Sequence, residues 1–294
     1  MHSNCSKYPF KALYLIPIFL LGCHQNTTQK KDSIYNSFDP TKPYEVAIEG
    51  IKQIPNDEIN YDLSCLSSAD KVIDVLSTIE ENVQETFGPS VSLQDEVAFG
   101  QEFHEAYCKD HQLIKKGNAV RNLKNILSRL QNAIVDPTGY TYKIHYVESD
   151  EINAFTIGAQ IYVTSALYDF CKTSDELAAV IAHEIYHNEL GHTKEIIQKR
   201  LMFPDEFNSV YSALTVSFGQ SKELNCDLHG VELMIKANFN GCAASKILNR
   251  LASTENQENT NLFEEFFRSH PHAKDRVKCV KNHLTTNYQI TCHE

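Results

Sequence analysis

The sequence predicts an α+β fold that is mainly helical and contains one small antiparallel sheet. Residues 141–147 alternate between apolar and polar side chains, as a half-buried strand does. Residues 152–156 and 160–164 follow as a predicted hairpin. Apolar residues at helical spacing dominate the rest of the chain beyond residue 68, so helices are expected before and after the sheet.

Breaks in the pattern separate the expected helices. Gly88-Pro89 and Asp136-Pro137 end helices, because proline cannot continue one. The helices are expected at 69–87, 94–115, 119–134, 170–191, 222–237, 243–251 and 273–283. Residues 34–64 and 253–261 are expected to be irregular, and 193–221 fits either a helix or a flexible cover.

The helix expected at 170–191 has the clearest boundaries. Thr173 and Glu176 form the T-x-x-E pattern of a capping box near its start, and Gly191 offers a stop. The apolar residues between them recur at helical spacing. They are Leu177, Val180, Ile181 and Ile185.

A candidate metal site lies in the middle of this helix, in the pentapeptide His183-Glu184-Ile185-Tyr186-His187. His183 and His187 are four residues apart, so both rings project from one face and can hold a single zinc ion. Glu184 lies where it can take a proton from a metal-bound water. The pattern predicts the zinc-binding helix of a metallopeptidase, with Glu184 as the general base.

Zinc in a catalytic site needs a third protein ligand, with water in the fourth position. A third His at position 193 would require a Gly at 190, but the chain has Thr193 and Leu190. A Glu from a later helix is the other known arrangement, and Glu223 with Asp227 fits its E-x-x-x-D pattern. Glu223 would bind zinc, and Asp227 would accept a hydrogen bond from a ligand His. The alternative is a solvated helix face.

Four motifs in order resemble one family. They are Asn153-Ala154-Phe155 with 161–163, the His-Glu helix, the E-x-x-x-D helix, and Ser269-His270-Pro271 with Arg276. The chain resembles the integral-membrane and periplasmic gluzincins of metallopeptidase family forty-eight, which include the HtpX heat-shock protease and the CAAX prenyl endopeptidase. The resemblance covers about residues 90–285 and implies a gluzincin-type zincin fold. It also implies a zinc endopeptidase whose Asn153-Ala154-Phe155 strand pairs with an extended substrate.

The chain departs from the family pattern at several positions. Cys226 and Ser269 replace the usual Ala and Thr, and Gly158-Ala159 replaces a Gly pair. No stretch has the roughly 20 apolar residues of a membrane-spanning helix, so the resemblance is closest to the periplasmic branch.

The N-terminus resembles a bacterial lipoprotein signal. Lys7 and Lys11 precede an apolar run, 12–21, and Cys23 ends a lipobox-like Leu-Leu-Gly-Cys. The alternative is an ordinary secretory signal. We expect a signal peptide at 1–22, a tether and irregular segment at 23–64, and the peptidase domain at 65–294. Lipid on Cys23, followed by His24, would anchor the protein to the outer membrane on its periplasmic side.

The net charge bears on the class of partner, and the cysteine content fits an oxidising compartment such as the periplasm. Removal of the two signal lysines lowers the net charge from -11 to near -13, which argues against nucleic acid as a partner. Loss of Cys5 and lipidation of Cys23 leave seven of nine cysteines, so at least one is unpaired. We expect disulfides Cys279–Cys292 and Cys65–Cys108. We expect Cys226 to be a buried apolar side chain.

His270 and His192 complete the candidate residues. His270 either braces the loop before Pro271 or lies near the metal, where it would hold the enzyme latent or stabilise the oxyanion. His192 is expected to be a positive charge at a helix C-terminus. The expected substrates are unfolded or misassembled envelope proteins, and a partner in the outer-membrane assembly machinery is left open. The alternative function is a non-proteolytic assembly factor for outer-membrane proteins.

Overall fold

The structure is a computed structural model that describes residues 89–202, 218–254, 262–270 and 273–293. These residues all belong to one of the two compact units into which the chain divides, Ala47–Glu294. The expected signal peptide, Cys23, the tether, the helix at 69–87, Pro271 and most of the loop at 253–261 lie outside the described residues.

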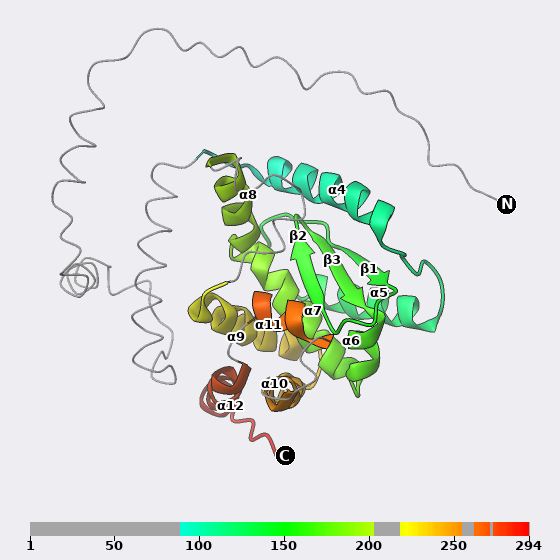
Figure 1. Cartoon of the computed structure of the whole chain (residues 1–294). Coiled ribbons are helices and arrows are strands. Elements are labelled where there is room, and N and C mark those ends of the chain that lie inside the picture. The colour runs from blue at the N-terminus through cyan, green and yellow to red at the C-terminus, as the bar shows by residue number, and fades with distance from the viewer. Residues whose placement is uncertain (1–88, 203–217, 255–261, 271–272, 294) are drawn as a thin grey trace, which may run out of the picture. The chain divides into compact units, whose positions relative to one another are not determined.

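The α+β class is confirmed, because helices surround one three-stranded sheet (Figure 1). Helices α4 (Leu93–Asp110) and α5 (Asn118–Gln131) precede strands β1 (Lys143–Val147), β2 (Ala154–Ile157) and β3 (Gln160–Thr164). The helices after the sheet are α6 (Ser165–Phe170), α7 (Ser174–Glu189), α8 (His192–Met202), α9 (Gln220–Lys236), α10 (Cys242–Thr254), α11 (Glu264–Ser269) and α12 (Ala273–Tyr288).

The sheet is mixed, so the expectation of a wholly antiparallel sheet is wrong. Its strand order is β1-β3-β2, and β2 and β3 form the predicted antiparallel hairpin. β1 pairs with β3 in parallel. The chain reverses direction twice between these two strands, and β3 then inserts between its two predecessors, so it runs the same way as β1. Both β1 and β2 are therefore edge strands.

Alternating side chains of the sheet enter two separate cores. Ala154, Ile161 and Val163 belong to the larger core, together with residues of α5, α7, α9, α10 and α12. Phe155 and Tyr162 point the other way, into a smaller aromatic core that is built with Phe103 and other residues of α4. The sheet thus separates a core built with α4 from a core built with α5, α7, α9, α10 and α12, and α8 packs on the side of α4 (Figure 1).

The helix expected at 170–191 is α7, which begins four residues later than expected, at Ser174. The Thr173 hydroxyl caps α7 by accepting a hydrogen bond from the Glu176 amide at 3.2 Å, and this cap separates α7 from α6. α7 ends before Gly191, whose φ of +78° is readily adopted by glycine. Nearly every residue of α7 after its first turn is buried, which places the candidate metal site on a rigid element.

The other helix boundaries differ most from the prediction at the ends of α4 and α12. α4 ends at Asp110 instead of residue 115, because the chain that follows pairs with β1. There the Ile114 amide donates to the Tyr146 carbonyl at 2.8 Å, and the Glu148 amide donates to the Gln112 carbonyl at 2.9 Å. α12 continues five residues beyond the expected end, to Tyr288.

Both expected disulfides are wrong. Cys292 bonds to Cys242 at the start of α10, with a Cα–Cα distance of 5.4 Å. Cys279 is disulfide-bonded elsewhere, so it is not the partner of Cys292. Cys108 is a thiol and takes part in no disulfide, while Cys65 lies outside the described residues. Spacing along the chain does not report which cysteines the packing of α10 and α12 brings together.

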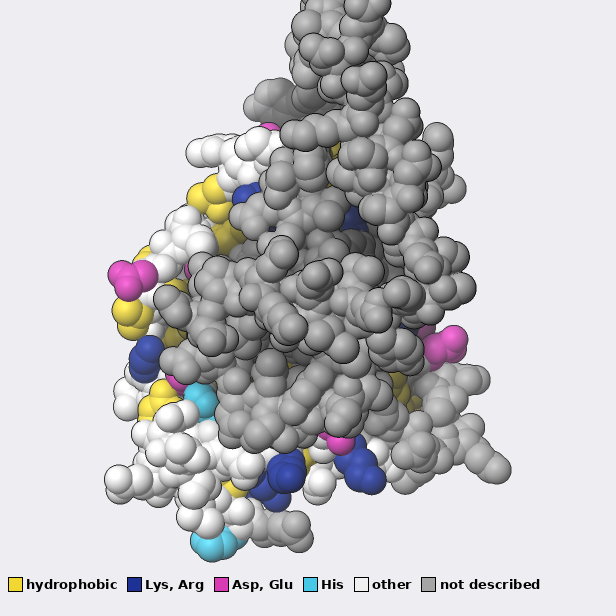
Figure 2. All heavy atoms as spheres, turned by 90° about the vertical axis from the view of Figure 1, so that its left-hand side faces the viewer, with side chains coloured by type: hydrophobic (Ala, Val, Ile, Leu, Met, Phe, Trp, Pro, Cys, Tyr) yellow, Lys and Arg dark blue, Asp and Glu magenta, His cyan; other side chains and the backbone are white. Residues whose placement is uncertain are grey.

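Within the described ranges, no helix is both long enough and apolar enough to cross a membrane. On the face that Figure 2 shows, the described side chains are a mixture of apolar, basic and acidic groups.

Two glycines bring α4 against the sheet. A Cβ at Gly100 would lie 2.5 Å from the Gly158 carbonyl oxygen and 2.7 Å from the Ile157 carbonyl oxygen. Both contacts are with backbone, which cannot move aside as a side chain can. Gly158 forms the β2–β3 turn with Ala159, and both have positive φ, of 51° and 68°. The Asn188 side chain of α7 accepts the Ala159 amide at 3.0 Å, so the turn is held from both sides.

Gly100→Ala tests this contact. Alanine in a helix interior is favoured over glycine by about 1 kcal/mol, but the clash with backbone costs about 1–3 kcal/mol. We therefore expect a net fall in the free energy of unfolding, measured by urea denaturation. The exposed neighbour Gln101→Ala is the control, with an expected change within about 0.5 kcal/mol. A Gly100→Ala protein more stable than the wild type would contradict the close contact.

Candidate metal centre

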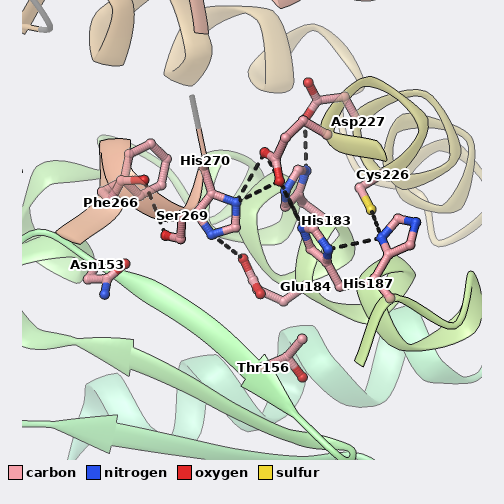
Figure 3. A network of polar contacts seen from close by, with 12 residues as sticks. Asn153, Thr156, His183, Glu184, His187, Cys226, Asp227, Phe266, Ser269 and His270 are labelled. Carbon is pink, nitrogen blue, oxygen red and sulfur yellow. Dashed lines mark hydrogen bonds and ion pairs between the residues drawn. The ribbon is translucent and has the colours of Figure 1, made fainter. Parts of the chain in front are cut away.

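The centre lies between α7 and α9, which pack closely against each other. Gly230 of α9 permits this approach, because a Cβ there would lie only 3.3 Å from the His183 amide nitrogen. α7 contributes His183, Glu184 and His187, and α9 contributes Glu223. Figure 3 shows His183, Glu184 and His187 on one side of α7 with His270 beside them, and the Glu223 carboxylate joins His183, His187 and His270 in one group of possible metal donors. All of them are buried.

The donor atoms have the spacing that a zinc ion requires. The Nε2 atoms of His183 and His187 are 3.0 Å apart. The Glu223 carboxylate lies 3.4 Å from His183 Nε2 and 3.3 Å from His187 Nε2. Tetrahedral ligands about 2.0–2.1 Å from zinc are separated by about 3.3 Å. The three separations are close to this value, so these side chains could hold one zinc ion with only small shifts.

Asp227, one turn after Glu223, orients His183. Its Oδ1 lies 2.8 Å from His183 Nδ1 and accepts a hydrogen bond from that nitrogen. The proton on Nδ1 leaves the Nε2 lone pair facing the other donors, as a metal ligand requires. Burial disfavours a charged ring, but Glu223 and Asp227 outweigh it and raise the pKa of His183 to about 10. The two carboxylates thus favour a positive charge at the position of the His183 ring.

Arg276 of α12 balances these carboxylates. Its Nε and Nη2 donate to the two oxygens of Asp227 at 2.6 and 2.8 Å, and its Nη1 donates to Glu223 at 2.6 Å. Burial alone would raise the pKa of Glu223, but His270 and Arg276 hold it well below its usual range. Arg276 also helps to lower the pKa of Asp227 against the effect of burial. Both carboxylates are therefore ionised.

Glu184 is the one acidic group of the cluster with a raised pKa. Burial is the main cause, and the nearby Glu223 charge adds to it. The carboxyl group lies 3.5 Å from His270 Nε2. A carboxyl whose pKa is raised toward neutrality suits a group that takes up and releases a proton during a reaction.

His270 joins the cluster from the end of α11. Its Nδ1 lies 3.1 and 3.2 Å from the two Glu223 oxygens, and its Nε2 is buried without a hydrogen-bond partner. Together with His183, His187 and Glu223 it forms a group of four side chains able to hold a metal. The sequence left two roles for His270, which were to brace the loop before Pro271 or to lie near the metal. The observed position agrees with the second role.

His192 and Cys226 form a layer behind His187 that sequence reasoning missed. His192 Nδ1 lies 3.1 Å from His187 Nδ1, and Cys226 Sγ lies 3.5 Å from His192 Nδ1. The expected role of His192 as a helix C-terminal charge is wrong, because the residue begins α8 and is buried. Burial lowers its pKa well below the usual value, so the ring is uncharged. Cys226 is fully buried, as expected for a residue in place of Ala.

The expected substrate strand forms one edge of the sheet, beside the centre (Figure 3). Ala154 and Phe155 begin β2 and are buried, and Phe155 stacks on Tyr162 with ring centroids 4.6 Å apart. Asn153 precedes β2, and its side-chain oxygen is buried without a hydrogen-bond partner. β2 is tied to α7, because the Asn188 amide donates to the Thr156 hydroxyl at 2.7 Å. Substrate pairing along β2 stays a prediction.

Comparison with known proteins agrees with the geometry. The model of peptidase family M48 matches residues 119–205 and 201–284, which together include every residue of the cluster. The mitochondrial metalloendopeptidase OMA1 of Schizosaccharomyces pombe is 27% identical over 177 residues, 54% of this chain and 52% of that protein.

Two bacterial proteins are also similar. The β-barrel assembly-enhancing protease of Yersinia pestis is 22% identical over 238 residues, 69% of this chain and 48% of that protein. The metalloprotease LoiP of Escherichia coli is 23% identical over 187 residues, 57% of this chain and 71% of that protein. The chain spans about half the length of the curated OMA1 relatives of Schizosaccharomyces pombe and Saccharomyces cerevisiae.

Arg276→Met tests the charge balance. Removing one partner of a buried ion pair leaves uncompensated charge, which costs about 3–5 kcal/mol. We expect the free energy of unfolding at neutral pH to fall by that amount. At acid pH we expect the difference in unfolding free energy between the variant and the wild type to be smaller. The sign follows from the depressed pKa values of Glu223 and Asp227, whose contribution to stability disappears as pH falls and both protonate.

Urea denaturation across pH 4–8 measures this effect, with Arg121→Met as the control. The Arg121 side chain is exposed and bonds to the exposed Asn118 side chain, so its loss is expected to change stability by less than about 0.5 kcal/mol. Equal losses in the two variants would show that Arg276 does not balance the carboxylates.

Proposed function

The chain belongs to peptidase family M48, and we propose that it is a zinc-dependent endopeptidase acting on unfolded or misassembled proteins of the bacterial envelope. One observation carries the proposal. Two His of α7 and one Glu of α9 converge, with their Nε2 and carboxylate oxygen atoms 3.0–3.4 Å apart, close to the spacing of tetrahedral zinc ligands. Glu184 lies next to them. A purely structural zinc site would have no need of a general base such as Glu184.

The proposed mechanism assigns each side chain a role. His183, His187 and Glu223 would hold zinc, which supplies a Lewis acid and lowers the pKa of a bound water when present. Glu184 takes the proton of the attacking water and later delivers it to the leaving amine. Asp227 keeps His183 in the tautomer with a free Nε2. Arg276 keeps Asp227 and Glu223 ionised, so that one can orient and the other can bind.

The proposed substrate class follows from the edge strand. A substrate added to β2 is held through main-chain hydrogen bonds, which any extended segment can make and a folded domain cannot. Unfolded or misassembled chains expose such segments. The similarity to a protease named for β-barrel assembly supports outer-membrane proteins as substrates and their assembly machinery as a partner. We place the protein in the periplasm, anchored to the outer membrane through lipid on Cys23.

The proposed activity is tested by cleavage of an unfolded protein such as casein by the zinc-loaded chain. Glu184→Gln removes the base while keeping the shape of the side chain, so we expect the cleavage rate to fall by about 10²–10⁴-fold. Glu105→Gln, on the exposed side of α4, is the matched control and should cleave at the wild-type rate. Chelation should abolish cleavage, and added zinc should restore it.

Cleavage that survives in Glu184→Gln would overturn the assignment of the base. Absence of cleavage by the wild type, even with zinc bound, would favour a non-proteolytic assembly factor.

His270→Ala tests the position of His270 over the centre. Four protein donors would fill the tetrahedral positions of zinc, whereas catalysis needs one of them open. We expect the variant to bind zinc more weakly and to cleave casein faster. Zinc affinity can be measured by competition with a fluorescent chelator. Unchanged affinity together with an unchanged rate would contradict a role near the metal.

A further inference from the structure

A groove lies at the opposite edge of the sheet from β2. It is a cavity of about 670 Å³ between α5, β1 and the chain that follows α4. Its lining consists of His104 of α4, residues 113–115, one face of α5 with Asn132 after it, and residues 142–146. None of the metal-centre residues lines it. The mechanism proposed above leaves this groove without a role.

One wall of the groove is an open strand edge. The Lys143 amide donates to the Ala159 carbonyl on the β3 side at 2.9 Å. Main-chain groups alternate along a strand, so the N–H and C=O of Ile144 point away from β3, toward the groove. Further along β1, the Tyr146 carbonyl accepts a hydrogen bond from the Ile114 amide. Just before β1, the Tyr142 amide donates to the Gln131 side chain at 3.1 Å. Within the described part of the chain, no hydrogen bond occupies the outer side of Ile144, so the outer edge of β1 is open at this residue.

The walls of the groove carry positive charge. Lys115 follows α4, Lys124 projects from α5, and Lys143 begins β1. All three are exposed, and none makes an ion pair with a carboxylate among the described residues. Burial lowers the pKa of the adjacent His104, and Lys143 and Lys115 lower it further. Three uncompensated lysines at one groove are a notable local excess in a chain of net charge -11.

We propose that this groove binds an acidic peptide segment in extended form, which pairs with β1 as an added strand. Ile144 offers one donor and one acceptor on the same edge, and a peptide backbone satisfies both. A small anion would use only the donor. The acidic side chains of the peptide would lie among Lys115, Lys124 and Lys143, whose positive charges attract them.

In this proposal the two edge strands bind different regions of a partner protein. β2 borders the metal centre and β1 borders the groove, with β3 between them. Adjacent strands are about 4.8 Å apart, so the two edges are separated by about 10 Å. An acidic region of one protein could occupy the groove while another region of the same protein reaches β2. Binding at β1 needs neither zinc nor Glu184, so it can be tested separately from the proposed peptidase activity.

The test is fluorescence anisotropy with a labelled decapeptide of alternating Asp and Val. The binding protein is the full chain carrying Glu184→Gln, which prevents cleavage during the measurement. We expect saturable binding that weakens as salt rises, and no binding of the same peptide with Lys in place of Asp. Lys124→Glu combined with Lys143→Glu should raise the Kd at least about tenfold. The charge-matched control is Lys172→Glu with Lys278→Glu, on exposed positions outside the groove, and should bind as before.

Strand pairing is tested by changing the peptide instead of the protein. Two versions are made, one N-methylated at the odd residues and one at the even residues. A strand in fixed register presents only alternate N–H groups to β1, so one version should lose binding and the other should keep it.

Three results would overturn the proposal. They are absence of peptide binding, equal weakening in the groove and control variants, and equal behaviour of the two methylated peptides. Displacement of the peptide by inorganic phosphate, but not by chloride at the same ionic strength, would identify a small-anion site and would also overturn it.

Discussion

Arg276 lies buried between two carboxylates of α9, and the geometry of the whole centre depends on this contact. Without its charge, Asp227 and Glu223 would be two buried anions close together, which a protein interior does not tolerate in ionised form. With it, Asp227 fixes the ring of His183 and Glu223 faces both His side chains. A residue of the last helix thus governs the protonation of groups on α7 and α9.

The same helix that carries the His pair is also bound to the sheet. Asn188 of α7 accepts the Ala159 amide and donates to the Thr156 hydroxyl, so the β2–β3 hairpin cannot move independently of His187, one residue away. Gly100 brings α4 against the other side of that turn. The edge strand and the metal donors are therefore linked, which would suit the proposed pairing of an extended substrate with β2.

The two edges of the sheet differ in chemistry. β2 is buried and mostly apolar and lies beside the centre, whereas β1 opens at Ile144 onto a groove with three lysines. An edge strand left unpaired in a soluble protein invites unspecific association, unless it is covered or charged. Here residues 112–114 cover the end of β1, and the lysines line its open start. Such an edge would discourage apolar strands and select acidic ones.

Local patterns in the sequence determined much of this protein. The spacing of His183 and His187, the Glu223–Asp227 turn, the Thr173 cap and the β2–β3 hairpin each depend on residues within a few positions of one another, where helix and strand periodicity decide the geometry. Tertiary structure alone decided the parallel pairing of β1, the Cys242–Cys292 bond, the burial of His192 behind His187 and the place of Arg276. Those contacts join residues of separate elements, and the packing of those elements sets which side chains meet.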